Sequence, residues 1–196
     1  MKTGKIRTAQ PGLAVAEGRT KWGWMRVWAS DRGVVAVEGP TPTRGETPPH
    51  QPLAGPARER AQQGLAEVTE YLAGKRREFT VPVDWSGVTG FTRQVLEACA
   101  SVPFGQQVSY GELARAVGSP RAARAAGQAL GRNRAPLIVP CHRVIATGGG
   151  LGGFGGGLEM KQRLLELERK WGGGGGRPPG TCNPPPRPDL EPKSAK

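Results

Sequence analysis

The pattern of hydrophobic and polar residues predicts a hairpin followed by a helix near the start of the chain. Residues 22–29 and 34–38 have the character of two short strands, and the turn-forming segment 30–33 lies between them. Apolar residues then recur at helical spacing over residues 57–73, and Gly74 follows where a C-terminal cap belongs. The segment therefore predicts two strands and one amphipathic helix.

A further short strand is predicted after this helix. Phe79, Val81 and Val83 alternate with Thr80 and Pro82, which is the period of a strand. Together these elements predict a small α/β domain. Nothing in it resembles a catalytic constellation.

The second region is predicted to be mostly helical. An apolar stripe with helical spacing precedes Pro103, which ends the helix. Cys99 lies on this stripe and is interpreted as a packed core thiol. The stripe consists of Phe91, Val95, Cys99 and Val102.

Two short helices are predicted next. Ser109 and Glu112 have the spacing of a capping box, which opens a helix that ends at Gly118. Ser119 is expected to cap a second helix that runs to about Gly131. Two helices joined by a tight turn make a helix-turn-helix, although many helical hairpins of this shape bind no DNA.

The second of these helices carries mainly small side chains and arginines. Small side chains let a helix approach another surface closely, and the arginines favour a phosphate-lined groove. A packed helix interface is the alternative explanation. The residues concerned are Arg121, Ala122, Ala123, Arg124, Ala125 and Ala126.

Charge strengthens the interpretation that this region binds nucleic acid. The chain has a net charge of +12, and residues 113–158 contain no Asp or Glu. A polyanion is therefore a plausible partner, although an ordinary solvated basic face would give the same pattern. The basic residues of this segment are Arg115, Arg121, Arg124, Arg132, Arg134 and Arg143.

Cysteine usage fits a reducing compartment, and hydropathy predicts neither a membrane span nor a signal peptide. The chain has three cysteines and no CxxC pair, so neither a disulfide framework nor a cysteine zinc site is expected. No window is long and apolar enough to span a membrane, and the first thirty residues lack the apolar block of a signal peptide. We expect a cytoplasmic protein without membrane attachment. Residues 172–196, which include Cys182, are predicted to be a disordered Gly/Pro-rich tail.

Cys141 is the candidate reactive residue. The short apolar run 137–139 lies between Pro136 and Pro140, so the chain reaches Cys141 from a stiffened segment. A nearby imidazole favours the thiolate, and His142 is the obvious partner. Neighbouring residues of a helix do not face each other, so a bridging water is the more natural link. The alternative is a structural thiol beside a hydrogen-bonded core histidine.

The last predicted helix supports the reactive interpretation. Lys161 and Glu168 fall within its apolar half, where a charge must be paired or functional. Glu168 is suited to orient an imidazole, which gives the series Cys141, water, His142 and Glu168. The apolar half consists of Leu158, Met160, Leu164, Leu165, Leu167 and Trp171.

From residue 90 to residue 171 the chain resembles the O6-alkylguanine-DNA alkyltransferases, also called methylated-DNA-protein-cysteine methyltransferases. Five sequence blocks carry the resemblance, and the spacing between them is similar as well. Resemblance over the first eighty residues is much weaker. The blocks are Phe-Thr-Arg-Gln-Val-Leu at 91–96, Val-Ser-Tyr at 108–110, Ala-Ala-Arg-Ala at 122–125, Asn133, and Pro-Cys-His-Arg-Val at 140–144.

The resemblance implies a role for each site residue. Cys141 would accept the alkyl group, with His142 as its water-linked base and Glu168 as the carboxylate that orients the base. Asn133 would brace the turn beneath the site. Tyr110 would help to rotate the damaged nucleotide out of the duplex and to stabilise the departing guanine. The same resemblance makes Arg124 the finger that fills the vacated space, with the helix around residues 122–126 in the minor groove.

The implied architecture has two domains and a tail. The fold class is a small α/β N-terminal domain, residues 1–84, followed by a mostly helical C-terminal domain with a helix-turn-helix, residues 88–171. The implied partner is double-stranded DNA containing O6-alkylguanine. Irreversible transfer to Cys141 would need no cofactor, and we expect a monomer with no obligate protein partner.

Two departures from the family stand out. The zinc-binding cysteines of some relatives are absent, so no structural metal is expected. The loop at 148–157 is almost all glycine apart from Leu151 and Phe154, so base recognition there would rest on backbone amides.

Three other functions compete with this interpretation. A protein that binds alkylated DNA without chemistry would not need Cys141. A helix-turn-helix regulator would need base-reading side chains that the alanine-rich helix lacks. A cysteine hydrolase would need a route to regenerate the enzyme, and none is evident.

Overall fold

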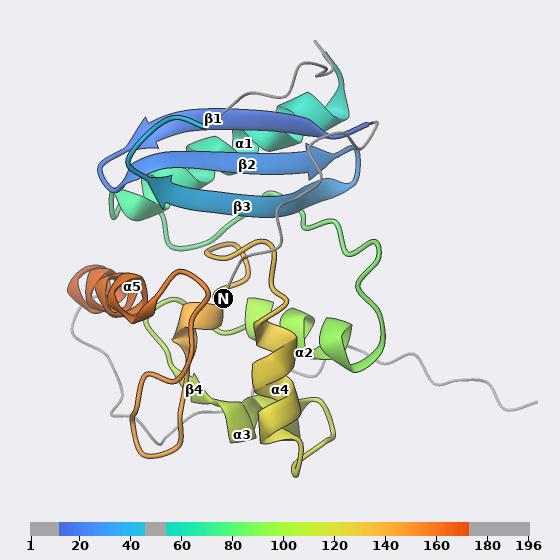
Figure 1. Ribbon diagram of the computed structural model, residues 1–196, viewed down its shortest axis with the longest axis vertical. Coiled ribbons are helices and arrows are strands. Elements are labelled where there is room, and N and C mark those ends of the chain that lie inside the picture. Colours follow the sequence, from blue (N-terminus) through green and yellow to red (C-terminus); the bar gives the residue numbers. More distant parts are fainter. Residues whose placement is uncertain (1–11, 46–53, 173–196) are drawn as a thin grey trace, which may run out of the picture.

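The computed structural model describes residues 12–45 and 54–172. Its first layer is an antiparallel sheet in the order β1-β2-β3, and α1 covers one face of this sheet (Figure 1). The register pairs Val15 with Trp28 and Val27 with Val37. The elements are β1 (Ala14–Thr20), β2 (Gly23–Ser30), β3 (Gly33–Thr41) and α1 (Pro56–Leu72).

The predicted hairpin and helix of this region are confirmed, and two details are corrected. Strand β1 was not predicted, because Glu17, Gly18 and Arg19 weaken its strand pattern. The strand predicted at 79–83 is wrong, because Pro82 lacks the N–H that a ladder requires. Only an isolated parallel bridge between Val83 and Val34 remains.

The second half consists of short helices below the sheet (Figure 1). Here β4 and β5 form a two-residue parallel pair, in which Val108 lies opposite Val144. The elements are α2 (Gly90–Ala100), β4 (Val108–Ser109), α3 (Tyr110–Ala116), α4 (Ala123–Leu130), a 3-10 turn η1 (Cys141–Arg143), β5 (Val144–Ile145) and α5 (Leu158–Trp171).

The start of α3 is as predicted, and the start of α4 is not. Ser109 accepts a hydrogen bond from the Glu112 amide at 3.1 Å, and the Glu112 carboxylate accepts one from the Ser109 amide. Ser119 does not cap α4. Its carbonyl instead accepts a hydrogen bond from the Ala122 amide in a separate turn, and α4 begins at Ala123 without a side-chain cap.

The two halves share one buried core. Val27, Val68 and Tyr71 of the first half belong to the same cluster as Val95 and Leu164 of the second, and all five are fully buried. Backbone contacts also join the halves. The Val37 amide of β3 donates to the Arg134 carbonyl at 2.8 Å. The N-terminal half is therefore firmly packed against the helical half, which holds the site described below.

The apolar face of α5 is narrower than the sequence suggested. Leu164 is fully buried, whereas Leu158 and Trp171 are 51% and 44% exposed. The buried charges Lys161 and Glu168 take the central positions of this face. The predicted tail and Cys182 lie outside the described residues, except for Gly172.

Candidate active site

Cys141 lies at the start of η1, directly after a tight buried turn. The turn is closed by a hydrogen bond from the Val139 amide to the Ala135 carbonyl at 2.9 Å. Leu137 adopts a positive φ of 77°, which is costly for a residue with a side chain. The Leu137 side chain is only 2% exposed, so core packing holds this conformation. The backbone directly before Cys141 is therefore held in one conformation by this hydrogen bond and by core packing.

Asn133 links this turn to the sulfur. Its Oδ1 accepts a hydrogen bond from the Ala135 amide at 3.0 Å, and its Nδ2 donates to the Val139 carbonyl at 2.9 Å. The same Nδ2 lies 3.1 Å from Cys141 Sγ and donates to it. Burial raises the pKa of the Cys141 thiol above its ordinary value, and the hydrogen bond from Asn133 opposes this only in part. At neutral pH the resting sulfur is consequently a thiol that needs a base.

His142 is placed to be a neutral base. The ring is fully buried, and its Nε2 lies 2.9 Å from Glu168 Oε1. Within the described part of the chain, its Nδ1 has no hydrogen-bond partner. Burial lowers the pKa of His142, although the hydrogen bond and charge of Glu168 raise it. The imidazole is thus uncharged at neutral pH and has one unused acceptor.

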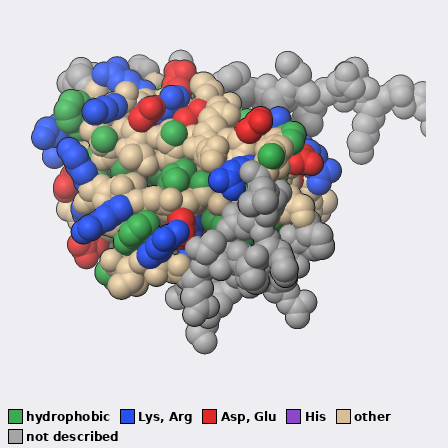
Figure 2. All heavy atoms as spheres, turned by 90° about the horizontal axis from the view of Figure 1, so that it is seen from above, with side chains coloured by type: hydrophobic (Ala, Val, Ile, Leu, Met, Phe, Trp, Pro, Cys, Tyr) green, Lys and Arg blue, Asp and Glu red, His purple; other side chains and the backbone are tan. Residues whose placement is uncertain are grey.

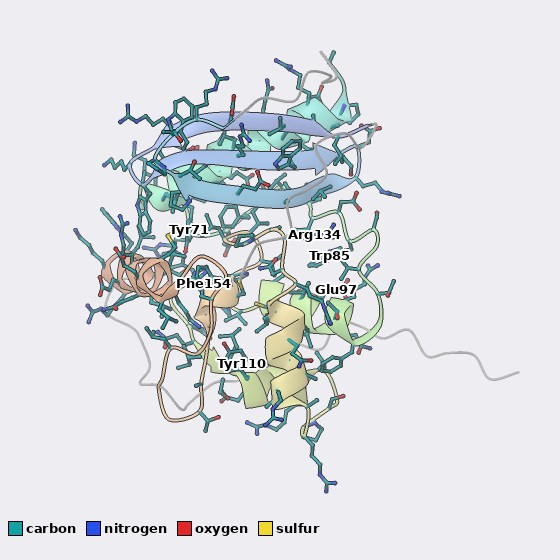
Figure 3. All side chains as sticks on the ribbon, viewed as in Figure 1. Tyr71, Trp85, Glu97, Tyr110, Arg134 and Phe154 are labelled. Atoms are coloured by element: carbon teal, nitrogen blue, oxygen red, sulfur yellow. The ribbon has the colours of Figure 1, made fainter. Side chains whose placement is uncertain are left out.

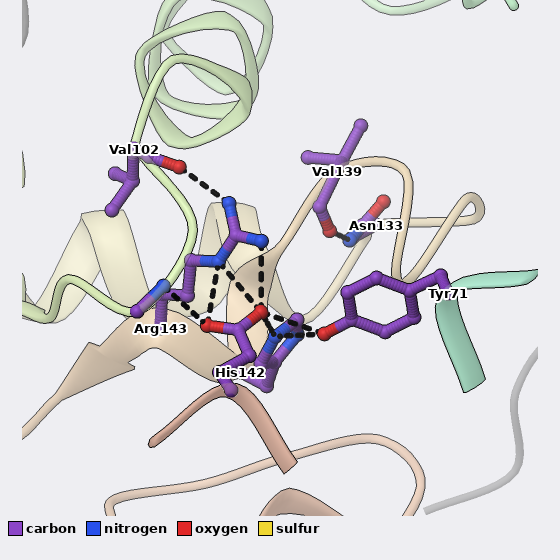
Figure 4. A network of polar contacts seen from close by, with 8 residues as sticks. Tyr71, Val102, Asn133, Val139, His142 and Arg143 are labelled. Carbon is purple, nitrogen blue, oxygen red and sulfur yellow. Dashed lines mark hydrogen bonds and ion pairs between the residues drawn. The ribbon is translucent and has the colours of Figure 1, made fainter. Parts of the chain in front are cut away.

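Figure 4 shows the polar network around Tyr71, His142 and Arg143, and Glu168 lies within hydrogen-bond distance of all three side chains. Arg143 Nε and Nη2 donate to its Oε1 at 3.0 and 2.8 Å, and the Gly105 amide donates to its Oε2 at 3.0 Å. Burial by itself would raise the pKa of Glu168, but hydrogen bonds and charges from His142 and Arg143 outweigh it and lower the pKa to about 2. The carboxylate is therefore charged at working pH.

Arg143 corrects one expectation about the basic segment. It is 5% exposed, and its Nη1 donates to the Val102 carbonyl. Its Nε and Nη2 form the ion pair with Glu168. It therefore cannot contribute to a phosphate-binding surface. The signal for its buried role was its place beside the reactive pair.

Tyr71 is a functional candidate that sequence reasoning missed. Its side chain extends from the end of α1 toward the lower half of the molecule (Figure 3). The hydroxyl donates to Glu168 Oε1 at 2.6 Å and lies 3.1 Å from His142 Nε2. The available signal was a tyrosine on the apolar face of an amphipathic helix, because a buried hydroxyl needs a partner.

The glycine loop is held from two sides. Lys161 is fully buried, and its Nζ donates to the Val144 carbonyl at 2.6 Å and to the Leu151 carbonyl. The Tyr110 hydroxyl donates to the Gly153 carbonyl at 3.3 Å. Gly152 has a φ of +66°, and a Cβ there would lie 2.6 Å from the Tyr110 oxygen, so a larger residue does not fit. The loop thus passes close to Tyr110.

Most of the residues expected to contact DNA lie on α4 or directly before it. Arg121, Arg124 and Ala125 are exposed, whereas Ala122 and Ala123 are partly exposed. Ala126 is fully buried, so its expected contact with DNA is wrong. Its methyl group faces the core because it lies about one turn from Ala129 and Leu130, which are also buried.

A different charge pattern occurs over β1 and α1. Figure 2 shows basic side chains on that face interspersed with acidic and hydrophobic ones. Within the sheet, Arg26 of β2 pairs with Glu17 of β1 at 3.1 Å. A stretch without acidic residues is therefore a feature of residues 113–158 and not of this face.

Residues 12–45 and 54–172 contain neither a cluster of metal ligands nor a membrane-spanning helix. In these ranges no group of three or more His, Cys, Asp or Glu side chains is arranged to hold a metal ion. Among the same residues, no helix combines the length and hydropathy needed to cross a membrane.

Comparison with known proteins identifies the relatives of this chain. The family profile described as 6-O-methylguanine DNA methyltransferase, DNA binding domain, matches residues 90–170. A methylated-DNA–protein-cysteine methyltransferase of Methanothermobacter thermautotrophicus is 38% identical over 146 residues, which cover 72% of this chain and 77% of the relative. The chain belongs to this methyltransferase family. The expected family is thereby confirmed.

Other relatives match over a shorter range. The inducible methylated-DNA–protein-cysteine methyltransferase of Bacillus subtilis is 48% identical over 104 residues. That match covers 53% of this chain and 58% of the relative, so the chain spans little more than half the length of this relative.

The fold agrees with solved structures of the family. The crystal structure of Mycobacterium tuberculosis OGT in complex with DNA superposes with a TM-score of 0.68 and 33% sequence identity. The superposition covers 81% of this chain and 94% of that chain. The sheet layer and the helical half therefore occur together in family members.

Proposed function

We propose that this protein repairs DNA by transferring an alkyl group from O6 of guanine to Cys141. The observation that carries the proposal is a thiol hydrogen-bonded to Asn133 and followed by a buried, neutral histidine whose Nδ1 is unused. Membership of the methyltransferase family supplies the substrate class. A methyl group is the simplest alkyl group that could be transferred.

The reaction follows from the states of the side chains. The Cys141 thiol gives its proton through a water molecule to His142 Nδ1, and the resulting imidazolium is stabilised by the Glu168 carboxylate. The sulfur then attacks the alkyl carbon. A new S–C bond forms as the O6–C bond breaks, and the electron pair leaves with the guanine. Hydrogen bonds from Tyr110 and loop amides stabilise that developing charge in this proposal.

A single turnover is the consequence of this chemistry. The product is a thioether, which has no acidic proton and is a poor leaving group, and no second nucleophile in the described network is positioned to remove it. One protein molecule therefore repairs one base. The cysteine hydrolase alternative fails on the same ground.

DNA binding is assigned to the helix-turn-helix of α3 and α4. The exposed small side chains of α4 allow a close approach to the minor groove, while Arg124 enters the base stack when the damaged nucleotide rotates out. A base within a duplex is otherwise inaccessible to a partly buried sulfur. The protein acts as a monomer in this proposal, with residues 1–84 and 88–171 as two domains.

The deciding experiment is a mass measurement after incubation with a duplex oligonucleotide containing O6-methylguanine. We expect the protein to gain one methyl group, the oligonucleotide to lose one, and peptide mapping to place the gain on Cys141. The unmethylated duplex is the control. Binding without any gain in mass would favour the alternative of a protein that recognises damage without repairing it.

A further inference from the structure

The N-terminal half contributes one side chain to the polar network around His142. Tyr71 ends the last turn of α1, and its ring is fully buried. Phe79 and Phe104 pack against it, with ring centroids 5.3 and 6.0 Å away. The hydroxyl is therefore held at a fixed position at the boundary between the sheet layer and the helices below it (Figure 3).

The hydrogen bonds around Tyr71 define where the protons lie. Glu168 is a carboxylate and can only accept, so the Tyr71 hydroxyl donates to Glu168 Oε1 at 2.6 Å. With its proton directed there, the Tyr71 oxygen is an acceptor toward His142 Nε2, 3.1 Å away. Both neighbours of Nε2 are thus acceptors, because Glu168 Oε1 lies 2.9 Å from it as well.

This arrangement selects one tautomer of the imidazole. Nε2 must carry the proton, and Nδ1 must present a lone pair. Nδ1 is the buried atom that lacks a partner in the described part of the chain. The same nitrogen is the one to which the proposed mechanism delivers the thiol proton.

We propose that Tyr71 is a positioning residue for the transfer reaction, through which the N-terminal domain holds Glu168 and the Nε2 edge of His142 so that Nδ1 faces the reactive thiol. The inference rests on the proposed function. It gives the N-terminal domain a part in the chemistry besides packing.

Tyr71 is suited to this part for two further reasons. Burial and the neighbouring Glu168 carboxylate raise the pKa of its hydroxyl well above the ordinary value of 10, so the hydroxyl keeps its proton at any working pH. The hydroxyl also completes the shell of Glu168 Oε1, which otherwise receives donors only from His142 and Arg143 among the described side chains. Without it, water or a rotated carboxylate would compete for Nε2.

The test compares Tyr71→Phe with Val68→Ala. The first change removes one oxygen from the network and keeps the ring. The second opens a small cavity one turn earlier on α1, where Val68 is fully buried and has no polar contact with the network. A loss that reflects only packing should be as large in Val68→Ala as in Tyr71→Phe.

Two readouts are measured on each variant. The first is the single-turnover rate of transfer from free O6-methylguanine, which needs no DNA contact. The second is nitrogen NMR of His142 in the unalkylated protein. The chain has two histidines, so His50→Gln leaves His142 as the only one. The spectrum reports the tautomer and the exchange of the Nε2 proton with water.

We expect Tyr71→Phe to lower the transfer rate by about tenfold to a hundredfold, as a loss of orientation at a reacting group does. Exchange of the Nε2 proton should become faster, while Val68→Ala should keep both properties near those of the wild-type protein. A wild-type rate and unchanged exchange in Tyr71→Phe would overturn the proposal. Equal changes in the two variants would overturn it too.

The two proposals fail in different ways. If the wild-type protein takes up no methyl group, the proposed function is wrong. The NMR measurement then still decides the role of Tyr71, because it is made on the unalkylated protein. Slow exchange that depends on the Tyr71 hydroxyl would support the positioning role, and exchange independent of it would refute that role.

Discussion

Arg143 and Glu168 form a bidentate ion pair next to His142, with guanidinium-to-carboxylate distances of 2.8 to 3.1 Å. Both side chains are buried. The pair neutralises a charge that would otherwise be costly in the core, and it fixes the carboxylate that holds the imidazole. In the proposed mechanism, stability and chemistry therefore depend on the same two residues.

Replacing Arg143 should be much more destabilising than replacing an exposed arginine. Arg143→Met leaves the buried Glu168 charge uncompensated, which costs about 3–5 kcal/mol of the free energy of unfolding. Arg93→Met is the matched control, since Arg93 pairs with Glu97 at 2.8 Å on the surface of α2. That change should cost less than about 1 kcal/mol. Urea unfolding measures both, and similar losses would contradict the buried-pair interpretation.

Cys141→Ser should abolish alkyl transfer and leave DNA binding intact. A serine hydroxyl titrates far above neutral pH and is a poor nucleophile beside a neutral imidazole. Cys99→Ala is the control, because Cys99 is fully buried and burial raises the pKa of its thiol well above the ordinary value. Mass spectrometry after incubation with methylated duplex measures transfer. Uptake of a methyl group by the Cys141→Ser protein would identify another acceptor.

Arg124→Ala should slow repair of duplex DNA much more than transfer from the free base. Extrusion of the damaged nucleotide costs on the order of a few kcal/mol, and the arginine is expected to offset part of this in the duplex only. Single-turnover rates at one salt concentration compare the two substrates. Arg169→Ala removes an exposed charge from α5 and should affect neither. Equal losses on duplex and free base would assign Arg124 to the fold instead of the base stack.

The stability of the protein should fall as the pH falls below 7. The pKa of His142 is lowered from its ordinary value of 6.5 by burial, so protonation favours the unfolded chain once the pH drops below about 6.5. The pKa of Glu168 is lowered from 4.5 to about 2, so its contribution is complete above 4.5 and is lost between that pH and about 2. Both groups therefore act in the same direction.

Urea unfolding at several pH values tests this dependence. The polar groups around His142 are Glu168 and Lys161 of α5, Tyr71 of α1 and the adjacent Arg143. The pKa of Glu168 is lowered to about 2 and that of Tyr71 is raised, so neither of these two changes charge between pH 5 and 7. His142→Gln should therefore flatten the curve in that range. A wild-type free energy of unfolding that stays constant from pH 7 to pH 5 would show that the histidine is not buried in its neutral form.

Local sequence was sufficient for elements with strong local signals. The capping box at Ser109 and Glu112, the turn between β2 and β3, and the periodicity of α1 and α5 all depend on residues within a few positions of one another. The predictions failed at β1 and at residues 79–83, where local signals are weak. At these places, pairing with a distant strand decides whether a strand forms.

The sequence by itself determined the family, the candidate Cys-His pair and the unusual charges of the last helix. It placed Glu168 on an apolar face, which shows that the charge has a partner but not which partner. Only the tertiary structure brought Tyr71 and Arg143 to that carboxylate, buried Ala126, and left Nδ1 of His142 without a hydrogen-bond partner among residues 12–45 and 54–172. Glu168 and Tyr71 are 97 residues apart, and contacts over such a separation depend on how whole layers pack, which no local pattern encodes.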